Sequence, residues 1–184
     1  EVDRLNKLHI KMLLNSGVQL IQGWAEFNSN NSVSIKQSKI SSKDLTRLTS
    51  DKILVAVGGI PQKVNIPGSD LAWVSDDIFL QEKLPDNIVI IGAGYIACEL
   101  ACILNSLGVK VTLIVRGDCL LKTFDYELSK ELEQVMQNRG VKIIFKDEII
   151  KLEGQPTDID IILSKGNAVN ANAVLFVVGR KPNI

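Results

Sequence analysis

The sequence has few of the residues that build metal sites and disulfide frameworks. Its 184 residues include three cysteines and one histidine, and no two cysteines form a Cys-x-x-Cys pair, so no zinc site is predicted. Cys98 and Cys102 lie four residues apart on a predicted helix, where the Cβ atoms are too far apart for an unstrained disulfide. We interpret both as small buried apolar side chains and not as a redox pair.

The sequence also lacks an excess of charge and a membrane-length apolar run. Lysine and arginine number 21, as do aspartate and glutamate, so no overall field favours nucleic acid or an anionic membrane as a partner. The most apolar stretch, residues 88–104, contains Gly92, Gly94 and Glu99 and is shorter than the roughly 20 residues of a membrane span. We interpret it as a buried strand that leads into a helix.

The N-terminus lacks the pattern of a secretion signal, which predicts a cytoplasmic location by default. It also lacks an initiator methionine, which is typical of a piece of a longer polypeptide.

Hydrophobic periodicity and turn residues divide the first part of the chain into short elements. We predict an amphipathic helix over 2–15 that stops at Gly17, a hairpin of strands over 18–27 and 33–36, a turn and edge strand over 37–50, a strand buried on both faces over 53–57, and a short helix over 75–81 with Ser75 as its N-cap. Pro61, Pro67 and Gly68 mark the best domain boundary.

From residue 88 onward, predicted strands alternate with predicted helices. The elements are a strand at 88–91, a helix at 95–107, a strand at 110–115, a helix at 126–139, a strand at 141–145, apolar runs at 149–152 and 159–163, and a last buried strand at 173–178. Such alternation predicts a parallel sheet with helices on its faces. The fold class is therefore α/β, a Rossmann-like parallel sheet with an antiparallel β-meander.

A glycine-rich turn connects the first of these strands to its helix. Gly92, Gly94 and Ala97 match the Gly-x-Gly-x-x-Gly/Ala pattern of dinucleotide-binding turns, in the strand-to-helix context that the pattern needs. The first glycine permits the tight turn, the second lets the backbone approach a pyrophosphate, and the alanine lets the helix pack close to the sheet. The helix N-terminus offers free N–H groups to phosphates. The sequence predicts a dinucleotide site; the alternative is a glycine-rich turn without a ligand.

The end of the second strand distinguishes the two nicotinamide cofactors. NAD-binding units place an acid there, about 20 residues after the glycines, to bind the ribose 2′-hydroxyl, whereas this sequence has Arg116, followed by Lys122. A guanidinium and an ammonium suit a 2′-phosphate, which favours NADPH over NADH. The alternative for the two cations is a pair of solvated surface side chains. The nearby Asp118 keeps NADH open as the cofactor.

Three further residues near the motif have open roles. Tyr95 lies at its mouth and either covers a nicotinamide or caps the helix surface. Glu99 lies one turn further on, and it either pairs with a group outside this chain or is exposed to solvent. Cys119 follows the cationic segment, but the lack of a base and of a resolving cysteine argues against a catalytic thiol.

Several motifs occur together in order along the whole chain. They are Ala56-Val-Gly-Gly59 with Pro61, Ile66-Pro-Gly68, Gly92-x-Gly-Tyr95-Ile96-Ala97-x-Glu99, Arg116-Gly-Asp118 with Phe124-Asp125, and Gly179-Arg-Lys-Pro-Asn183. Through them the chain resembles the pyridine nucleotide-disulfide oxidoreductases, flavoproteins that pass electrons from a nicotinamide through FAD to a disulfide. Within that family it is most similar to the glutathione reductases.

The resemblance implies NADPH and FAD as cofactors and assigns roles to individual residues. Tyr95 would cover the nicotinamide pocket, Arg116 and Lys122 would hold the 2′-phosphate, and Glu99 would pair with a lysine of the FAD domain. The matched motifs also place Ile96, Ala97 and Gly179 at the cofactor.

The resemblance further implies how the chain is divided and what lies outside it. Residues 1–60 and 177–184 resemble parts of an FAD-binding domain, and residues 61–176 resemble an NAD(P)H-binding domain. The FAD fingerprint, the redox cysteines and the His–Glu dyad of the family have no counterpart here, so we predict no catalytic residue and no turnover for this central fragment alone. The expected parent is a homodimeric reductase of glutathione disulfide. The alternatives are an NAD-linked relative such as dihydrolipoyl dehydrogenase and a non-catalytic dinucleotide-binding module.

Overall fold

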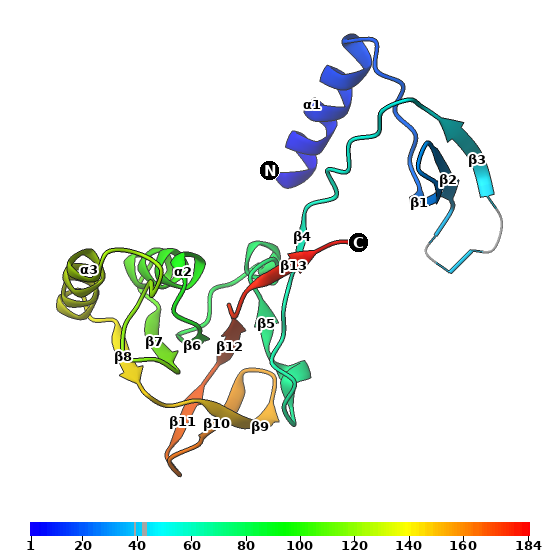
Figure 1. Cartoon of the computed structure of the whole chain (residues 1–184). Helices are drawn as coiled ribbons and strands as arrows, with labels where there is room; N and C mark the ends of the chain where they lie inside the picture. Colours follow the sequence, from blue (N-terminus) through cyan, green and yellow to red (C-terminus); the bar gives the residue numbers. More distant parts are fainter. Residues whose placement is uncertain (39, 42–43) are drawn as a thin grey trace. The chain divides into compact units, whose positions relative to one another are not determined.

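A computed structural model describes residues 1–38, 40–41 and 44–184 of the chain (Figure 1). The chain divides into two compact units, residues 1–56 and 57–184. Part of the turn predicted within 37–50 lies outside the described residues. The division into parts of an FAD-binding domain, residues 1–60 and 177–184, and a nucleotide-binding domain, residues 61–176, stays a prediction.

The first unit consists of one helix and one small antiparallel sheet. Its elements are α1 (Val2–Asn15), β1 (Trp24–Ser29), β2 (Ser32–Lys36) and β3 (Asp44–Thr49), with the strand order β1-β2-β3. The predicted helix is confirmed, and Gly17 follows it with φ at +78°, a left-handed conformation that glycine adopts without strain. None of the α1 side chains is buried. Among the described residues of this unit, Ile35 is the one buried apolar side chain.

Two strand predictions in this region are wrong. The strand predicted at 18–27 begins only at Trp24, because the hairpin pairs Trp24 with Lys36, where β2 ends, so the preceding residues have no strand opposite them. The apolar run at 53–57, predicted as a buried strand, lies in no strand, and Leu54 is 90% exposed. No strand of the described residues pairs with this run, and an apolar sequence without a partner forms no ladder.

A five-stranded parallel sheet forms the centre of the second unit (Figure 1). Its strands, in spatial order, are β5 (Trp73–Val74), β12 (Ala173–Phe176), β6 (Asn87–Ile91), β7 (Lys110–Val115) and β8 (Lys142–Phe145). Helix α2 (Tyr95–Ser106) connects β6 to β7, and α3 (Tyr126–Asn138) connects β7 to β8. Every neighbouring pair of strands is parallel. The predicted succession of strands and helices, and the fold class, are confirmed.

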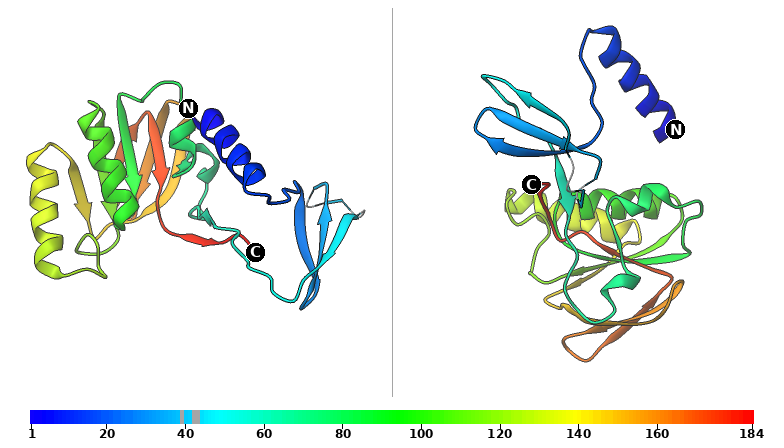
Figure 2. Two further views of the ribbon diagram at one scale, coloured as in Figure 1. Left: turned by 90° about the horizontal axis from the view of Figure 1, so that it is seen from above. Right: turned by 90° about the vertical axis from the view of Figure 1, so that its right-hand side faces the viewer.

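Alternate residues of the central strands face two different cores. Ile88 and Ile90 belong to a cluster with α2 and with Met136 of α3, whereas Val89 and Ile91 belong to a cluster on the other face. That face is covered by the antiparallel meander of β9 (Ile149–Gln155), β10 (Asp158–Leu163) and β11 (Ala168–Ala171), which the right-hand view of Figure 2 shows on the side of the sheet away from α2. A strand covered on both faces needs apolar residues at successive positions, which explains the continuous run at 88–91.

The apolar stretch 88–104 is thus β6, the glycine turn and most of α2. Within α2, Cys98 is 5% exposed. Burial, and to a lesser degree the neighbouring Cys102, raises the pKa of the Cys98 thiol to about 11. All three cysteines are free. The interpretation of Cys98 as a buried apolar side chain is confirmed, whereas Cys102 packs against the same core but is only partly buried. No helix in the described part of the chain is long and apolar enough to cross a membrane.

Short elements complete the second unit. They are the 3₁₀ turns η1 (Ser69–Leu71) and η2 (Asp77–Leu80) and the antiparallel pair of β4 (Gly59–Pro61) and β13 (Arg180–Pro182). The helix predicted at 75–81 is only η2, and Asp76, not Ser75, occupies its N-cap position. Ser75 instead donates to Asp76 (3.1 Å), and the Arg180 guanidinium donates to both residues (3.3 Å to Ser75, 2.8 Å to Asp76). The hydrogen bond from Arg180 lowers the pKa of the Asp76 carboxyl below its usual value.

Candidate functional site

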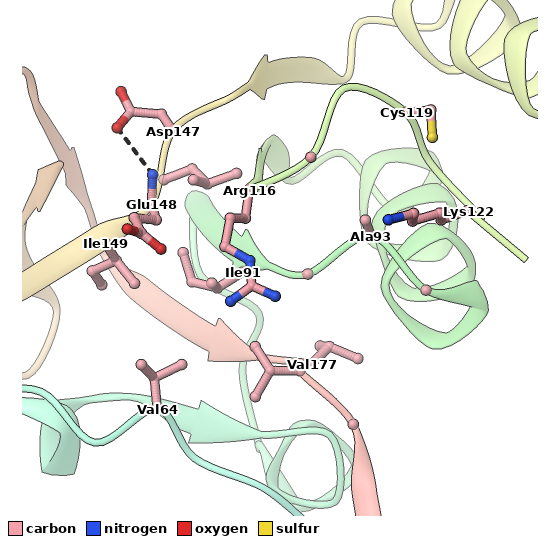
Figure 3. A pocket seen from close by; sticks show the side chains of 16 residues that line it. Val64, Ile91, Ala93, Arg116, Cys119, Lys122, Asp147, Glu148, Ile149 and Val177 are labelled. Carbon is pink, nitrogen blue, oxygen red and sulfur yellow. Dashed lines mark hydrogen bonds between the residues drawn. The ribbon is translucent and has the colours of Figure 1, made fainter. Parts of the chain in front are cut away.

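A cavity of about 600 Å³ lies at the carboxyl ends of β6, β7, β8 and β12 (Figure 3). Ligands of open parallel sheets bind at this edge, where the chain runs to opposite sides from neighbouring strands. Here β7 lies on one side of β6 and β12 on the other. The volume falls in the range of small-molecule sites. Five residues predicted from the sequence line it: Gly92, Gly94, Arg116, Lys122 and Gly179.

The two glycines of the turn are needed for different reasons. Gly92 has φ at +149°, and a Cβ atom there would collide with the carbonyl oxygen of Val177. It would also lie 3.5 Å from the Cβ of the fully buried Ala97, so this end of the turn is closely packed. A Cβ atom on Gly94 would meet nothing within 4 Å. The first glycine therefore fits the turn against the sheet, and the second leaves open space beside the backbone for a ligand.

The N-terminus of α2 points its backbone N–H groups at this turn. Gly94 is the N-cap, and within the described residues no side chain caps the helix. Helix α3 differs, because the Asp125 carboxylate accepts hydrogen bonds from the N–H groups of Glu127 (2.9 Å) and Leu128 (3.3 Å). The first N–H groups of a helix have no acceptor inside the helix. Those of α2, with the positive end of the helix dipole, are thus in place to bind an anion.

Two cations line the cavity from loops that the fold holds close to the glycine turn. Arg116 directly follows β7, and Lys122 lies on the segment between β7 and α3. The Leu121 N–H donates to the Ala93 carbonyl (2.8 Å), and the fully buried Leu120 anchors the same segment in the core. Both cations are exposed, and in the described part of the chain neither has an ion-pair partner within 4.0 Å. Neither the guanidinium nor the ammonium is therefore engaged, among the described residues, in an ion pair that a ligand phosphate would have to break.

Two carboxylates after β8 also line the cavity, and the sequence analysis missed them. Asp147 is 4% exposed and accepts hydrogen bonds from Ser164 Oγ (2.8 Å) and the Glu148 N–H (2.9 Å). Burial alone would raise the pKa of Asp147, but these bonds, a third from the Lys165 backbone and the charge of Lys165 hold it below its usual value. Glu148 is exposed. The sequence carried one signal for them, since both acids come two and three residues after the end of the strand predicted at 141–145.

The remaining predicted residues lie elsewhere around the turn. Tyr95, 58% exposed, and Ile96 line a second, smaller cavity of about 90 Å³. Ala97 is buried in the packing of α2. Glu99 and Asp118 are exposed and line neither cavity. A partner for Glu99 outside this chain stays a prediction.

The whole chain matches one protein family and curated relatives. The sequence pattern of "Pyridine nucleotide-disulphide oxidoreductase" matches residues 1–184. The chain is similar to a glutathione reductase of Nostoc sp. (strain PCC 7120), at 40% identity, and to one of Burkholderia cepacia, at 32%. Each match covers 100% of this chain and 39% of the relative. The chain therefore spans well under half the length of these relatives.

Comparison with solved structures concerns the fold. Two structures of the HOCl-induced flavoprotein disulfide reductase of Escherichia coli are similar to this chain, with TM-scores of 0.88 and 0.86. The sequence identities are 22% and 23%, and the matched regions cover 100% and 98% of this chain and 41% of each of the two solved chains.

Proposed function

Because this chain belongs to the pyridine nucleotide-disulphide oxidoreductase family, we propose that its second unit binds NADPH and that the longer protein reduces glutathione disulfide. In that protein the nicotinamide would supply electrons that pass through FAD to a redox disulfide. Glutathione reductases from two organisms match the entire chain and support this choice of substrate. A homodimeric parent and a cytoplasmic location stay predictions.

One observation carries the choice of NADPH. The cavity at the glycine turn has two cations, Arg116 and Lys122, without ion-pair partners among the described residues. In NAD-binding units an acid occupies the end of the second strand, where Arg116 lies here. A guanidinium binds phosphate through two parallel N–H donors, and an ammonium adds a point charge.

The residues of this chain divide the binding of the cofactor among them. The N–H groups of the first turn of α2 would receive the pyrophosphate, which approaches over Gly94. Arg116 and Lys122 would bind the 2′-phosphate at one end. Tyr95 and Ile96, in the smaller cavity beside Gly179, would contact the nicotinamide end.

The pairing of β4 with β13 supports the proposed division into domains. Residues 59–61 and 180–182 form an antiparallel pair, so the chain enters and leaves the second unit along neighbouring paths. Such an arrangement suits a nucleotide domain inserted between two parts of an FAD domain, with residues 1–60 and 177–184 belonging to the latter.

A second candidate is an NAD-linked enzyme of the same family, such as dihydrolipoyl dehydrogenase. The observation that favours it is the pair of carboxylates in the cavity, Asp147 and Glu148. A carboxylate repels a 2′-phosphate and accepts a hydrogen bond from a 2′-hydroxyl. Asp147 already accepts hydrogen bonds from the protein. Glu148 is therefore the carboxylate that would repel the 2′-phosphate of NADPH.

Titration of the 184-residue chain with NADPH and with NADH, by calorimetry, tests the proposal. We expect NADPH to bind more tightly than NADH. Arg116→Gln should lower the affinity for NADPH by about 10- to 100-fold, because a charge-assisted contact to phosphate is lost. The affinity for NADH should change little. Arg139→Gln is the matched control, since it removes the same charge from an exposed residue that lines neither cavity.

Equal affinities for the two nucleotides, or tighter binding of NADH, would refute the assignment to NADPH. An equal loss of affinity in the Arg139 and Arg116 variants would refute the assignment of the 2′-phosphate to Arg116.

A further inference from the structure

Hydrogen bonds fix the backbone of Glu148, and its side chain lines the cavity. Its N–H donates to the Asp147 carboxylate (2.9 Å), and its carbonyl accepts from the Ser164 N–H (2.8 Å). Ser164 Oγ also donates to Asp147 (2.8 Å), and Asp147 is 4% exposed. Both backbone groups of Glu148 are therefore fixed by a frame of hydrogen bonds to Asp147, which is buried, and to Ser164. Figure 3 shows its carboxylate turned toward the interior of the cavity and away from that of Asp147.

The same frame is bonded to the strand end that carries Arg116. The Lys146 N–H donates to the Gly117 carbonyl (2.9 Å), and the Asp147 N–H donates to the Val115 carbonyl (3.4 Å). The two acceptors are the residues on either side of Arg116. The backbones that carry Arg116 and Glu148 are thus fixed to each other, and both side chains line one cavity.

The Glu148 carboxylate acts against the selectivity that Arg116 provides. Within the described residues it has no ion-pair partner within 4.0 Å, and it is exposed to the water of the cavity. A 2′-phosphate carries about two negative charges, so the carboxylate weakens its binding, whereas a 2′-hydroxyl is neutral and can donate a hydrogen bond to it.

We propose that Glu148 is a specificity-determining residue, which lowers the preference of the site for NADPH over NADH. The proposal rests on the proposed function, because it concerns the same nucleotide site. Arg116 and Lys122 make the site bind NADPH more tightly than NADH. Glu148 reduces the ratio of the two affinities and allows NADH to bind.

The test compares Glu148→Gln with the native chain in titrations with NADPH and NADH. Removal of the charge should raise the affinity for NADPH by about three- to tenfold, as expected for loss of one like charge at a solvated site. The affinity for NADH should stay unchanged or fall slightly. The gain for NADPH should shrink as salt is raised from 50 to 500 mM, because screening weakens the repulsion. Glu131→Gln is the matched control, since it removes the same charge from an exposed residue of α3 outside the cavity and should change neither affinity.

An unchanged ratio of the two affinities in Glu148→Gln would overturn the proposal. So would an equal loss for both nucleotides, because Glu148 would then bind a part that they share, such as the adenine. Glu148→Ala should reproduce the Glu148→Gln result, and thermal melting checks that both variants are folded. Failure of the underlying function is recognised separately, because the native chain would then bind NADH as tightly as NADPH and would be insensitive to Arg116→Gln.

Discussion

The two units of this chain differ in how they bury their apolar residues. Helices α1 and α2 have similar lengths, 14 and 12 residues, yet α2 buries five side chains and α1 buries none. The second unit has an apolar core on each face of its parallel sheet, whereas the described part of the first unit buries one apolar side chain, Ile35. Amphipathic periodicity therefore predicts a helix in both cases, but only packing determines whether the helix contributes to a core.

The largest effect is expected from separating the units. Residues 57–184, produced alone, should unfold cooperatively in urea with a free energy of unfolding of roughly 5 kcal/mol or more, as for other small domains, because both of their cores are internal. Residues 1–56, produced alone, should show no cooperative transition, because the one buried apolar side chain in their described part does not offset the entropy of ordering the chain. Circular dichroism during urea titration measures both.

A cooperative transition in residues 1–56, or loss of structure in residues 57–184, would contradict the conclusion that only the second unit folds around its own apolar core. Nucleotide binding by residues 57–184 provides a second readout, since every residue that lines the larger cavity lies within them.

A smaller effect is expected from truncation of single leucine side chains, one in each unit. Leu113→Ala should lower the free energy of unfolding of the whole chain by about 3–4 kcal/mol, because Leu113 is fully buried in the sheet and its loss leaves a cavity. Leu14→Ala in α1 should change it by less than about 0.5 kcal/mol, because Leu14 is 56% exposed.

Leu128→Ala, at a site 64% exposed on α3, is the matched control within the second unit and should behave like Leu14→Ala. If Leu14→Ala lowered the free energy of unfolding as much as Leu113→Ala, α1 would have to be packed against another surface in solution.

The smallest effect is expected within the second unit, where a polar frame rather than an apolar core shapes the cavity wall. Hydrogen bonds lower the pKa of Asp147 in the folded chain. A carboxyl group with a lowered pKa stabilises the fold above its unfolded pKa of about 4, and this stabilisation is lost as the pH falls through the lower folded value. Asp147→Asn should therefore lower the urea midpoint at pH 7, and the difference from the native chain should shrink below about pH 4.

Asp86→Asn is the control for this prediction, since Asp86 is exposed and should shift the midpoint little at either pH. A midpoint difference for Asp147→Asn that stays constant, or grows, as the pH falls would show that the carboxylate form does not stabilise the frame.

The sequence predicted the second unit far better than the first. Residues 88–145 contain long periodic segments separated by glycines, and each predicted strand and helix there is present within one residue or so of its predicted ends. In the first unit, the strand predicted at 18–27 depended on pairing with β2, and the run at 53–57 depended on a partner that no described strand supplies. Apolar content predicts that a segment seeks burial, but the partner strand decides whether it becomes a strand.

By itself, the sequence determined the glycine turn, the order of strands and helices, and the residues Arg116 and Lys122 at the cavity, because these depend on local patterns and on fixed spacing along the chain. Only the tertiary structure decided that Asp147 and Glu148 line the same cavity as Arg116. That juxtaposition joins strand ends about 30 residues apart through hydrogen bonds from Lys146 and Asp147 to the β7 end. The position after the strand predicted at 141–145 places both acids at the carboxyl edge of a parallel sheet, but which strand end they lie beside depends on the order of strands in the folded sheet.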